Sequence, residues 1–312
     1  MSEPYFLGVD GGGTKTRFAL MSQRKLVAEA QLGTSYHPDV GLDGVGDVLA
    51  EGVLQVLSRA GIDASQIAHA FFGLPAYGED RQATPVLRAL PATILGHERY
   101  TCDNDMVCGW AGSLGAEDGI NVVAGTGSIG YGQRRGRAAR AGGWGEAFSD
   151  EGSAYWIAMQ GLNAYSRMSD GRLPRGPLHA LVNESLNLED DLELCALVYG
   201  ANARSRGELA RLSPLVARAA ALGDSAALGI FARAGQELAQ IALALRAKLG
   251  YESNEVVRLS YSGGAFAAGD LLMAPFRAAL TTAGPGFEIR QPLYDPHFGA
   301  ALYAARLWSA TR

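Results

Sequence analysis

The feature that most limits the possible folds is a strand, a glycine-rich turn and a second strand, which occurs twice. In the first copy, apolar runs at 5–10 and 16–21 flank three consecutive glycines. In the second copy, runs at 119–124 and 128–133 flank Gly125 and Gly127. A glycine turn between two short apolar runs is typical of a β-hairpin. The repeat predicts two lobes built on one plan.

The rest of the hydrophobic pattern alternates strands with helices. Apolar residues at helical spacing predict helices over 43–60, 84–90, 105–114 and 269–283, with a final helix over 296–309. Further strands are expected at 26–32, 67–73, 99–102 and 256–262, and a helix-rich segment at 151–250. This alternation predicts an α/β protein. The 312 residues predict two domains, 1–115 completed by a helix at 297–312, and 116–296.

Composition excludes several classes of function. Hydrophobic residues make up 48% of the chain, which is enough to bury a core. A net charge of −5 without a basic block argues against nucleic acid and against an anionic membrane surface. We expect no membrane span and no secretory signal, since neither type of apolar segment is visible. Three cysteines without a paired spacing indicate a reducing cytoplasm.

The first glycine turn can bind an anion. Successive glycines let backbone N–H groups converge on a phosphate, and Thr14 and Thr16, on either side of Lys15, can add hydroxyl donors. Asp10 can hold a hydrated Mg²⁺ next to the phosphates. An ordinary hairpin loop is the alternative. A Walker loop is absent, and a dinucleotide fingerprint would need glycine where Thr16 stands.

The second turn, Gly125-Thr126-Gly127-Ser128, offers another set of backbone donors and two hydroxyls. One such turn is weak evidence, but two could grip one polyphosphate. A serine nucleophile is the rival interpretation. The hydrolase elbow needs GxSxG around Ser128, and Thr126 breaks that pattern.

A short acidic segment, Asp103-Asn104-Asp105, follows an expected strand and precedes an expected helix. A carboxylate there can accept the proton of a hydroxyl nucleophile during phosphoryl transfer. Helix capping is the alternative use of these residues. Spacing alone does not separate Asp103 from Asp105.

The segment from Gly143-Trp144 to Asp150-Glu151 suits a polyol ligand. Carboxylates accept hydrogen bonds from hydroxyls, and an aromatic ring stacks on a sugar face. The alternative is a core tryptophan and an acidic first turn of a helix.

The last glycine motif, Gly263-Gly264-Ala265, lies between an expected strand and an expected helix. A glycine pair there can admit the flat face of adenosine. Taken alone, it is only a strand-to-helix turn.

In this order the motifs resemble the N-acetylglucosamine kinase family, in the BadF-type group of the actin–hexokinase superfamily. The resemblance covers nearly the whole chain. It implies a two-lobed, ribonuclease-H-like α/β fold with a central ATP cleft. It also implies ATP with Mg²⁺ as co-substrate, the 6-hydroxyl of N-acetylglucosamine or a related amino sugar as acceptor, and a homodimer.

The resemblance also implies roles for individual residues. Asp105, rather than Asp103, matches the position of the base. Tyr36 stands where family kinases often have Asn before His37, which leaves the sugar open. The implied nucleotide contacts are Asp10, Gly12, Gly13, Thr14, Lys15, Gly125, Thr126, Gly127, Ser128, Gly263, Gly264 and Ala265, and the implied sugar contacts are Tyr36, Gly143, Trp144, Asp150 and Glu151.

Two other functions fit parts of the pattern. BadF-type relatives include ATPases that activate acyl-CoA reductases or dehydratases through an iron–sulfur cluster, which needs cysteines placed to bridge two subunits. A non-catalytic sugar-binding regulator would need room for a DNA-reading domain before the first strand. The zinc-cysteine signature of another bacterial sugar kinase family is missing, so no structural metal is expected.

Overall fold

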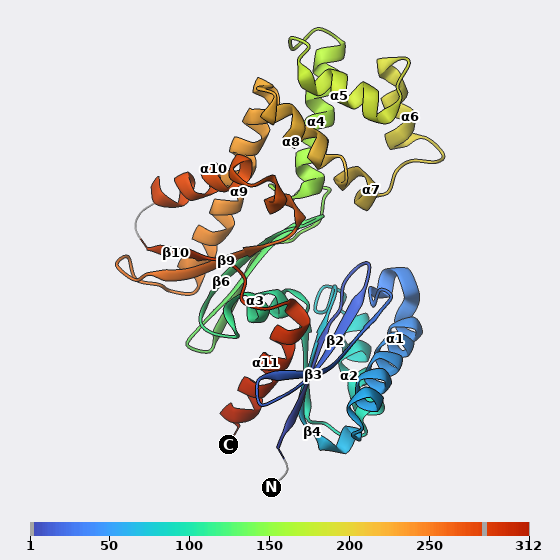
Figure 1. The fold of residues 1–312 in the computed structure, drawn as a ribbon, viewed down its shortest axis with the longest axis vertical. Coiled ribbons are helices and arrows are strands. Elements are labelled where there is room, and N and C mark those ends of the chain that lie inside the picture. Colours follow the sequence, from blue (N-terminus) through green and yellow to red (C-terminus); the bar gives the residue numbers. More distant parts are fainter. Residues whose placement is uncertain (1–2, 283–285, 312) are drawn as a thin grey trace. The chain divides into compact units, whose positions relative to one another are not determined.

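A computed structural model describes residues 3–282 and 286–311. These residues form two compact units (Figure 1). Unit 1 is Met1–Gly119 together with Gln291–Arg312, and unit 2 is Ile120–Arg290. Positions 283 and 312, at the ends of two predicted elements, lie outside the described residues.

Unit 1 contains, in its described residues, a five-stranded sheet of order β3-β2-β1-β4-β5. Strand β1 is antiparallel to β2 and parallel to β4, and β4 is parallel to β5. The parallel strands β1, β4 and β5 therefore end at one edge of the sheet. The elements of unit 1 are β1 (Tyr5–Asp10), β2 (Thr16–Ser22), β3 (Lys25–Leu32), α1 (His37–Ala60), η1 (Ala64–Gln66), β4 (Ile67–Leu74), α2 (Ala83–Leu95), β5 (Tyr100–Asn104), α3 (Met106–Leu114) and α11 (Pro296–Ala310).

Side chains of β1 alternate between two packed faces of this sheet. Leu7 and Val9 are buried in the cluster that includes residues of α1 and α2. Gly8 points to the other face, where a Cβ atom would lie 2.2 Å from the backbone nitrogen of Ala301 in α11. The ring of Phe6 packs edge-on against Trp308 of the same helix, with centroids 5.5 Å apart. Helix α11 thus lies directly on β1, although the two are far apart in sequence.

Unit 2 contains, among the residues that the structure describes, a five-stranded sheet of order β10-β9-β6-β7-β8. Read in the opposite direction, from β8 to β10, the sheet places the third, second, first, fourth and fifth strands of its unit side by side. Unit 1 has the same order, as the repeated pattern predicts. The elements of unit 2 are β6 (Gly119–Ala124), β7 (Ser128–Arg134), β8 (Arg137–Gly142), α4 (Ala154–Ser169), α5 (Pro177–Leu186), η2 (Asp191–Glu193), α6 (Leu194–Tyr199), α7 (Arg206–Ala210), α8 (Ser213–Ala221), α9 (Ser225–Lys248), β9 (Val257–Ser262), η3 (Gly264–Ala268), α10 (Asp270–Thr282) and β10 (Phe287–Arg290).

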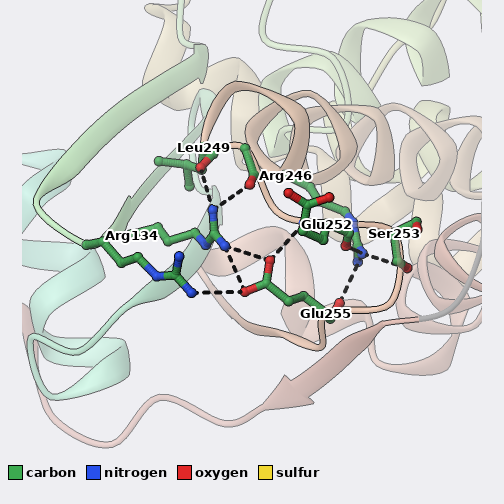
Figure 2. Close-up of polar contacts among 8 residues, drawn as sticks. Arg134, Arg246, Leu249, Glu252, Ser253 and Glu255 are labelled. Atoms are coloured by element: carbon green, nitrogen blue, oxygen red, sulfur yellow. Dashed lines mark hydrogen bonds and ion pairs between the residues drawn. The ribbon is translucent and has the colours of Figure 1, made fainter.

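The C-terminal end of α9 is fastened to β7 by Arg134 (Figure 2). Its guanidinium donates to the carbonyl oxygens of Leu249 and Gly250, groups that a helix end leaves without intrahelical partners. The same guanidinium meets both carboxylate oxygens of Glu255, at 2.8 and 2.6 Å. Arg246, from α9 itself, donates to the carbonyl oxygen of Glu255 at 3.0 Å. These contacts tie the long helix to the loop that leads into β9.

Replacing Glu255 by Gln should lower the melting temperature at neutral pH. The backbone N–H of Glu252 and the Arg134 guanidinium hold the pKa of the Glu255 carboxyl below its usual value. This stabilisation is fully present above the unfolded pKa and is lost as the pH falls through the lowered folded pKa. The difference in melting temperature should therefore shrink in acid. Glu252→Gln is the matched control, because the backbone contacts of Glu252 remain; an equal loss in both variants would contradict this role.

The predicted strands and helices are found, with shifts at several ends. Helix α1 begins at His37 and has a kink at Gly41, where φ is +72°, so the prediction of 43–60 describes only the part after the kink. Strand β5 runs to Asn104 rather than ending at residue 102. Strands β8 and β10 were not predicted. Their sequences explain this, since neither β8 (RAARAG) nor the short β10 (FEIR) has a long apolar run.

Among the described residues, no single helix is long and apolar enough to cross a membrane. The segments Arg206–Ala221 and Ser225–Lys248 reach the required length and apolar content only as a pair, and they are bent by 118°.

Candidate functional site

The acidic residues of unit 1 gather where its parallel strands end. Asp10 is the last residue of β1, and Asp103 lies near the end of β5 in register with Gly73 of β4. Asp105 follows β5, and its backbone N–H donates to the carbonyl oxygen of Leu74 at 3.3 Å. Ligands of α/β proteins commonly bind at the carboxyl ends of parallel strands. The chain therefore places its candidate metal and base residues at one sheet edge.

Asp10 is the most perturbed carboxyl group of this edge. Burial, and to a lesser extent the negative charge of Asp105, raise the pKa of Asp10 to about 8. Arg17 and Lys15 oppose the shift only in part. The thiol of Cys108 lies in the same cluster and donates to the carbonyl oxygen of Val9 at 3.4 Å. A carboxylate that is costly to ionise alone suits a site where a cation arrives with the ligand.

The structure distinguishes the two candidate bases by their surroundings. Asp103 uses one carboxylate oxygen to accept the backbone N–H of Asn104 at 2.7 Å, and burial raises its pKa. Asp105 stands at the start of α3 with helical backbone angles and is the main charge acting on Asp10. Of the two candidate bases, Asp105 also acts more strongly than Asp103 on the pKa of the Cys108 thiol, second among the nearby charges to Asp10. Asp105 therefore belongs electrostatically to the pair with Asp10.

The first glycine loop is held at its base and exposed at its tip. The N–H of Gly11 donates to the carbonyl oxygen of Gly73 at 2.8 Å, and the Thr34 hydroxyl donates to that of Gly12 at 2.9 Å. A Cβ on Gly11 would lie 2.5 Å from the hydroxyl oxygen of Ser35, so only glycine fits this close approach. Thr34 also accepts the N–H of Tyr36 at 3.0 Å, which ties the predicted sugar residue to the loop.

Three loop residues beyond this base are exposed, namely Gly13, Thr14 and Lys15. Nothing lies within 4 Å of where a Cβ of Gly13 would be. The N–H groups and the hydroxyl of this tip are thus placed where an anion can reach them.

Unit 2 brings its second glycine loop against the Asp150–Glu151 segment. The N–H of Ser128 donates to the Asp150 carboxylate at 3.2 Å, and the Ser128 hydroxyl donates to the carbonyl oxygen of Glu151 at 2.8 Å. The carbonyl oxygen of Gly125 accepts the N–H of Ala154 at 2.9 Å, at the start of α4. Two motifs separated by more than twenty residues therefore form one structure, while Thr126 remains exposed at the turn.

The third glycine motif packs on the second. Gly263 has φ of +103°, and a Cβ there would lie 2.4 Å from the carbonyl oxygen of Ala124 and 2.7 Å from the nitrogen of Gly125. Gly263 and Gly264 are exposed, whereas the side chain of Ala265 is buried in the core. Within unit 2, the predicted phosphate and adenosine turns are therefore neighbours.

The predicted sugar-binding aromatic residue is in the open loop after β8. Trp144 is 71% exposed, and Phe148 in the same loop is 76% exposed. Gly143 begins this loop with φ of +71° against Ile129, which would lie 2.6 Å from an added Cβ. Glu151 accepts the Ser149 hydroxyl at 3.2 Å. The core alternative does not hold for Trp144, because a core side chain would be buried.

Sequence reasoning missed Arg206, which lies 56 residues after Asp150 on the short helix α7. Its guanidinium donates to the Asp150 carboxylate and lies 3.2 Å from that of Glu146. The capping box formed by Ser205 and Glu208 is visible in the sequence and predicts a helix start. It gives no indication of the long-range partner.

Within the described residues, no group of three or more His, Cys, Asp or Glu side chains is arranged to hold a metal ion. The three cysteines are free, on β5, α3 and α6. An Mg²⁺ ion that arrives with nucleotide needs only one or two carboxylates, since phosphates and water complete its shell. The carboxylate of Asp10 at the end of β1 fits that requirement.

The two sheets share one strand order, and the predicted fold class, an α/β fold of the actin–hexokinase type, is confirmed. The chain belongs to the BadF/BadG/BcrA/BcrD ATPase family, which it matches over residues 7–304.

Individual relatives are similar over nearly the whole chain. An N-acetyl-D-glucosamine kinase of Dictyostelium discoideum is 29% identical, over 97% of this chain and 98% of that protein. An N-acetylmuramic acid/N-acetylglucosamine kinase of Clostridium acetobutylicum is also 29% identical, over 96% and 98%. The crystal structure of a candidate N-acetylglucosamine kinase from Chromobacterium violaceum is 25% identical, with a TM-score of 0.68 over 97% of this chain and all of that one. The predicted enzyme class, a phosphotransferase with an alcohol acceptor, is confirmed.

Proposed function

We propose that this protein is an ATP-dependent sugar kinase that phosphorylates the 6-hydroxyl of N-acetylglucosamine or a related amino sugar. The full-length similarity to curated kinases of such sugars supports the choice of acceptor. The observation that carries the chemistry is the coupled pair Asp10 and Asp105 at the carboxyl ends of β1 and β5. Phosphoryl transfer needs charge neutralisation and one proton acceptor, and this pair offers a carboxylate for each task.

In unit 1, Asp105 acts as the general base that takes the proton of the sugar hydroxyl. Asp10 holds Mg²⁺ through water, and the ion supplies charge neutralisation for the phosphates when it is bound. The exposed loop tip at Gly13, Thr14 and Lys15 donates hydrogen bonds to phosphate oxygens. Tyr36, which is linked to Gly12 through Thr34, helps to select the sugar.

In unit 2, the turn from Gly125 to Ser128 contributes phosphate contacts. The exposed Gly263 and Gly264 leave space for adenosine, while buried Ala265 supports that turn from below. Trp144 stacks on a sugar ring, and its 71% exposure makes the indole accessible to such a ligand. Residues Gly143, Asp150 and Glu151 complete the proposed sugar contacts.

The test is ADP release with Mg-ATP against N-acetylglucosamine, glucosamine, N-acetylmannosamine, glucose and no sugar. We expect a strong rise with N-acetylglucosamine or one close amino sugar, because binding of the acceptor should trigger productive transfer. Phosphorus NMR of the product should show a phosphomonoester on the 6-carbon. Equal ADP release with and without every sugar would contradict the proposal and favour the ATPase function of other BadF-type proteins.

Assembly and location are further parts of the proposal. The resemblance to N-acetylglucosamine kinases supports a homodimer, and the three free cysteines support a reducing cytoplasm. Light scattering coupled to size exclusion would measure the mass, and a monomer at assay concentrations would contradict the dimer.

A further inference from the structure

Asp150 has a backbone conformation that few side chains adopt. Its φ is +64°, in the left-handed region that favours glycine. Its side chain is only 3% exposed, so the carboxylate depends on protein partners rather than on water. One carboxylate oxygen accepts the N–H of Ser128 at 3.2 Å, and the other accepts from the Arg206 guanidinium. A buried charge in a strained position is held only where its surroundings fix it.

The guanidinium of Arg206 reaches three parts of unit 2. It bonds Asp150, lies 3.2 Å from the Glu146 carboxylate in the loop that carries Trp144, and would lie 2.6 Å from a Cβ on Gly127. The arginine itself is on α7, within the helical part of the unit. At 39% exposure its side chain is reachable from solvent. One side chain thus links the glycine turn, the aromatic loop and the helical segment.

We propose that Arg206 is a positioning residue for sugar binding, which fixes the Asp150 carboxylate and ties the Trp144 loop to the glycine turn. This inference rests on the proposed kinase function and deepens it. Arg206 acts through Asp150 and Glu146 and needs no contact with the sugar. An ion pair through a planar guanidinium is directional, so it can fix the orientation of a carboxylate better than a lysine ammonium.

The charges around Asp150 give the proposal a specific signature. Burial raises the pKa of Asp150, whereas the Ser128 N–H and Arg206 lower it and the Glu146 charge raises it. Removing Arg206 takes away the cationic contribution and leaves burial and the Glu146 charge, which raise the pKa, opposed only by the Ser128 N–H. In Arg206→Gln the carboxyl should therefore hold its proton to higher pH than in wild type, so the loss of sugar binding should be greater at lower pH and should shrink as the pH rises.

The experiment compares Arg206→Gln with wild type and with Arg211→Gln, an exposed arginine at the end of the same helix. In Arg206→Gln we expect the KM for the sugar at pH 7 to rise about tenfold or more, with a smaller change in kcat. The KM should approach that of wild type in alkaline buffer, and added guanidinium ion should restore part of the loss. Arg206→Lys should keep part of the affinity, and Arg211→Gln should behave as wild type.

Carbon-13 NMR of labelled aspartate, assigned with Asp150→Asn, measures the link without any turnover. We expect the Asp150 carboxyl to titrate at higher pH in Arg206→Gln than in wild type. An unchanged titration, or a KM change that is equal at every pH and insensitive to guanidinium, would overturn the positioning role. Absence of sugar-dependent turnover in the wild-type enzyme would instead overturn the proposed function. The NMR titration would still test whether Arg206 lowers the pKa of Asp150.

Discussion

In Asp105→Asn, turnover should fall about a hundredfold or more while the protein stays folded. Removing a general base costs this much because the hydroxyl proton then has no acceptor in the transition state. The substitution also removes the charge that raises the pKa of Asp10, so Asp10 should ionise more readily. We therefore expect Mg-ATP binding, measured by calorimetry, to be retained or strengthened while kcat collapses. Weak binding with unchanged kcat would contradict the assignment.

The matched control is Asp103→Asn, two residues earlier on the same edge. The Asp103 carboxylate accepts the N–H of Asn104, a local contact that an amide oxygen can also make. This variant should keep most of its turnover. If Asp103→Asn lost activity and Asp105→Asn kept it, the base would be Asp103.

The second large effect is expected for Asp10→Asn, which should lower kcat/KM at least about a hundredfold, because it removes the carboxylate proposed to hold Mg²⁺. The same substitution should stabilise the free protein. With its pKa raised to about 8, folded Asp10 binds a proton that the unfolded chain releases above pH 4. Wild-type stability should therefore fall as the pH rises from about 4 to about 8, by at most about 1.4 kcal/mol per pH unit from this group.

Urea unfolding across this pH range measures that contribution. The advantage of Asp10→Asn over wild type should be near zero at pH 4 and should grow up to pH 8. Asp39→Asn is a suitable control, since Asp39 is an exposed residue in the first turn of α1. An advantage that does not depend on pH would show that burial of Asp10 costs the folded protein nothing.

The sequence was most informative where local patterns decide the structure. The paired strands around each glycine turn follow from their apolar runs, and α9 lies within the helix-rich segment predicted at 151–250. It was least informative where partners are distant. The sequence of β8 shows the apolar spacing of neither a helix nor a strand. It becomes a strand because it pairs with β7 from Ile129 to Arg134. Tertiary context of this kind overrides weak local preference.

The candidate site divides in the same way. Glycine and hydroxyl positions were visible as motifs, and the structure brings Ser128 to Asp150 across 22 residues. Arg206 was invisible because its role depends on where α7 packs, and no local pattern encodes that. The raised pKa of Asp10 was equally hidden, because it arises from burial and from a neighbour 95 positions later in the chain.

The placement of α11 on β1 sets an order of events during synthesis. Phe6 and Gly8 leave the ribosome early. Helix α11, whose Trp308 packs on Phe6, is synthesised only after all of unit 2. At about 5–20 residues per second, unit 2 takes on the order of ten seconds or more to make. A nascent chain therefore carries one apolar face of its first sheet uncovered for that time. Unit 2 is continuous in sequence and can close first, so the part of the protein that is made first is the last to be completed.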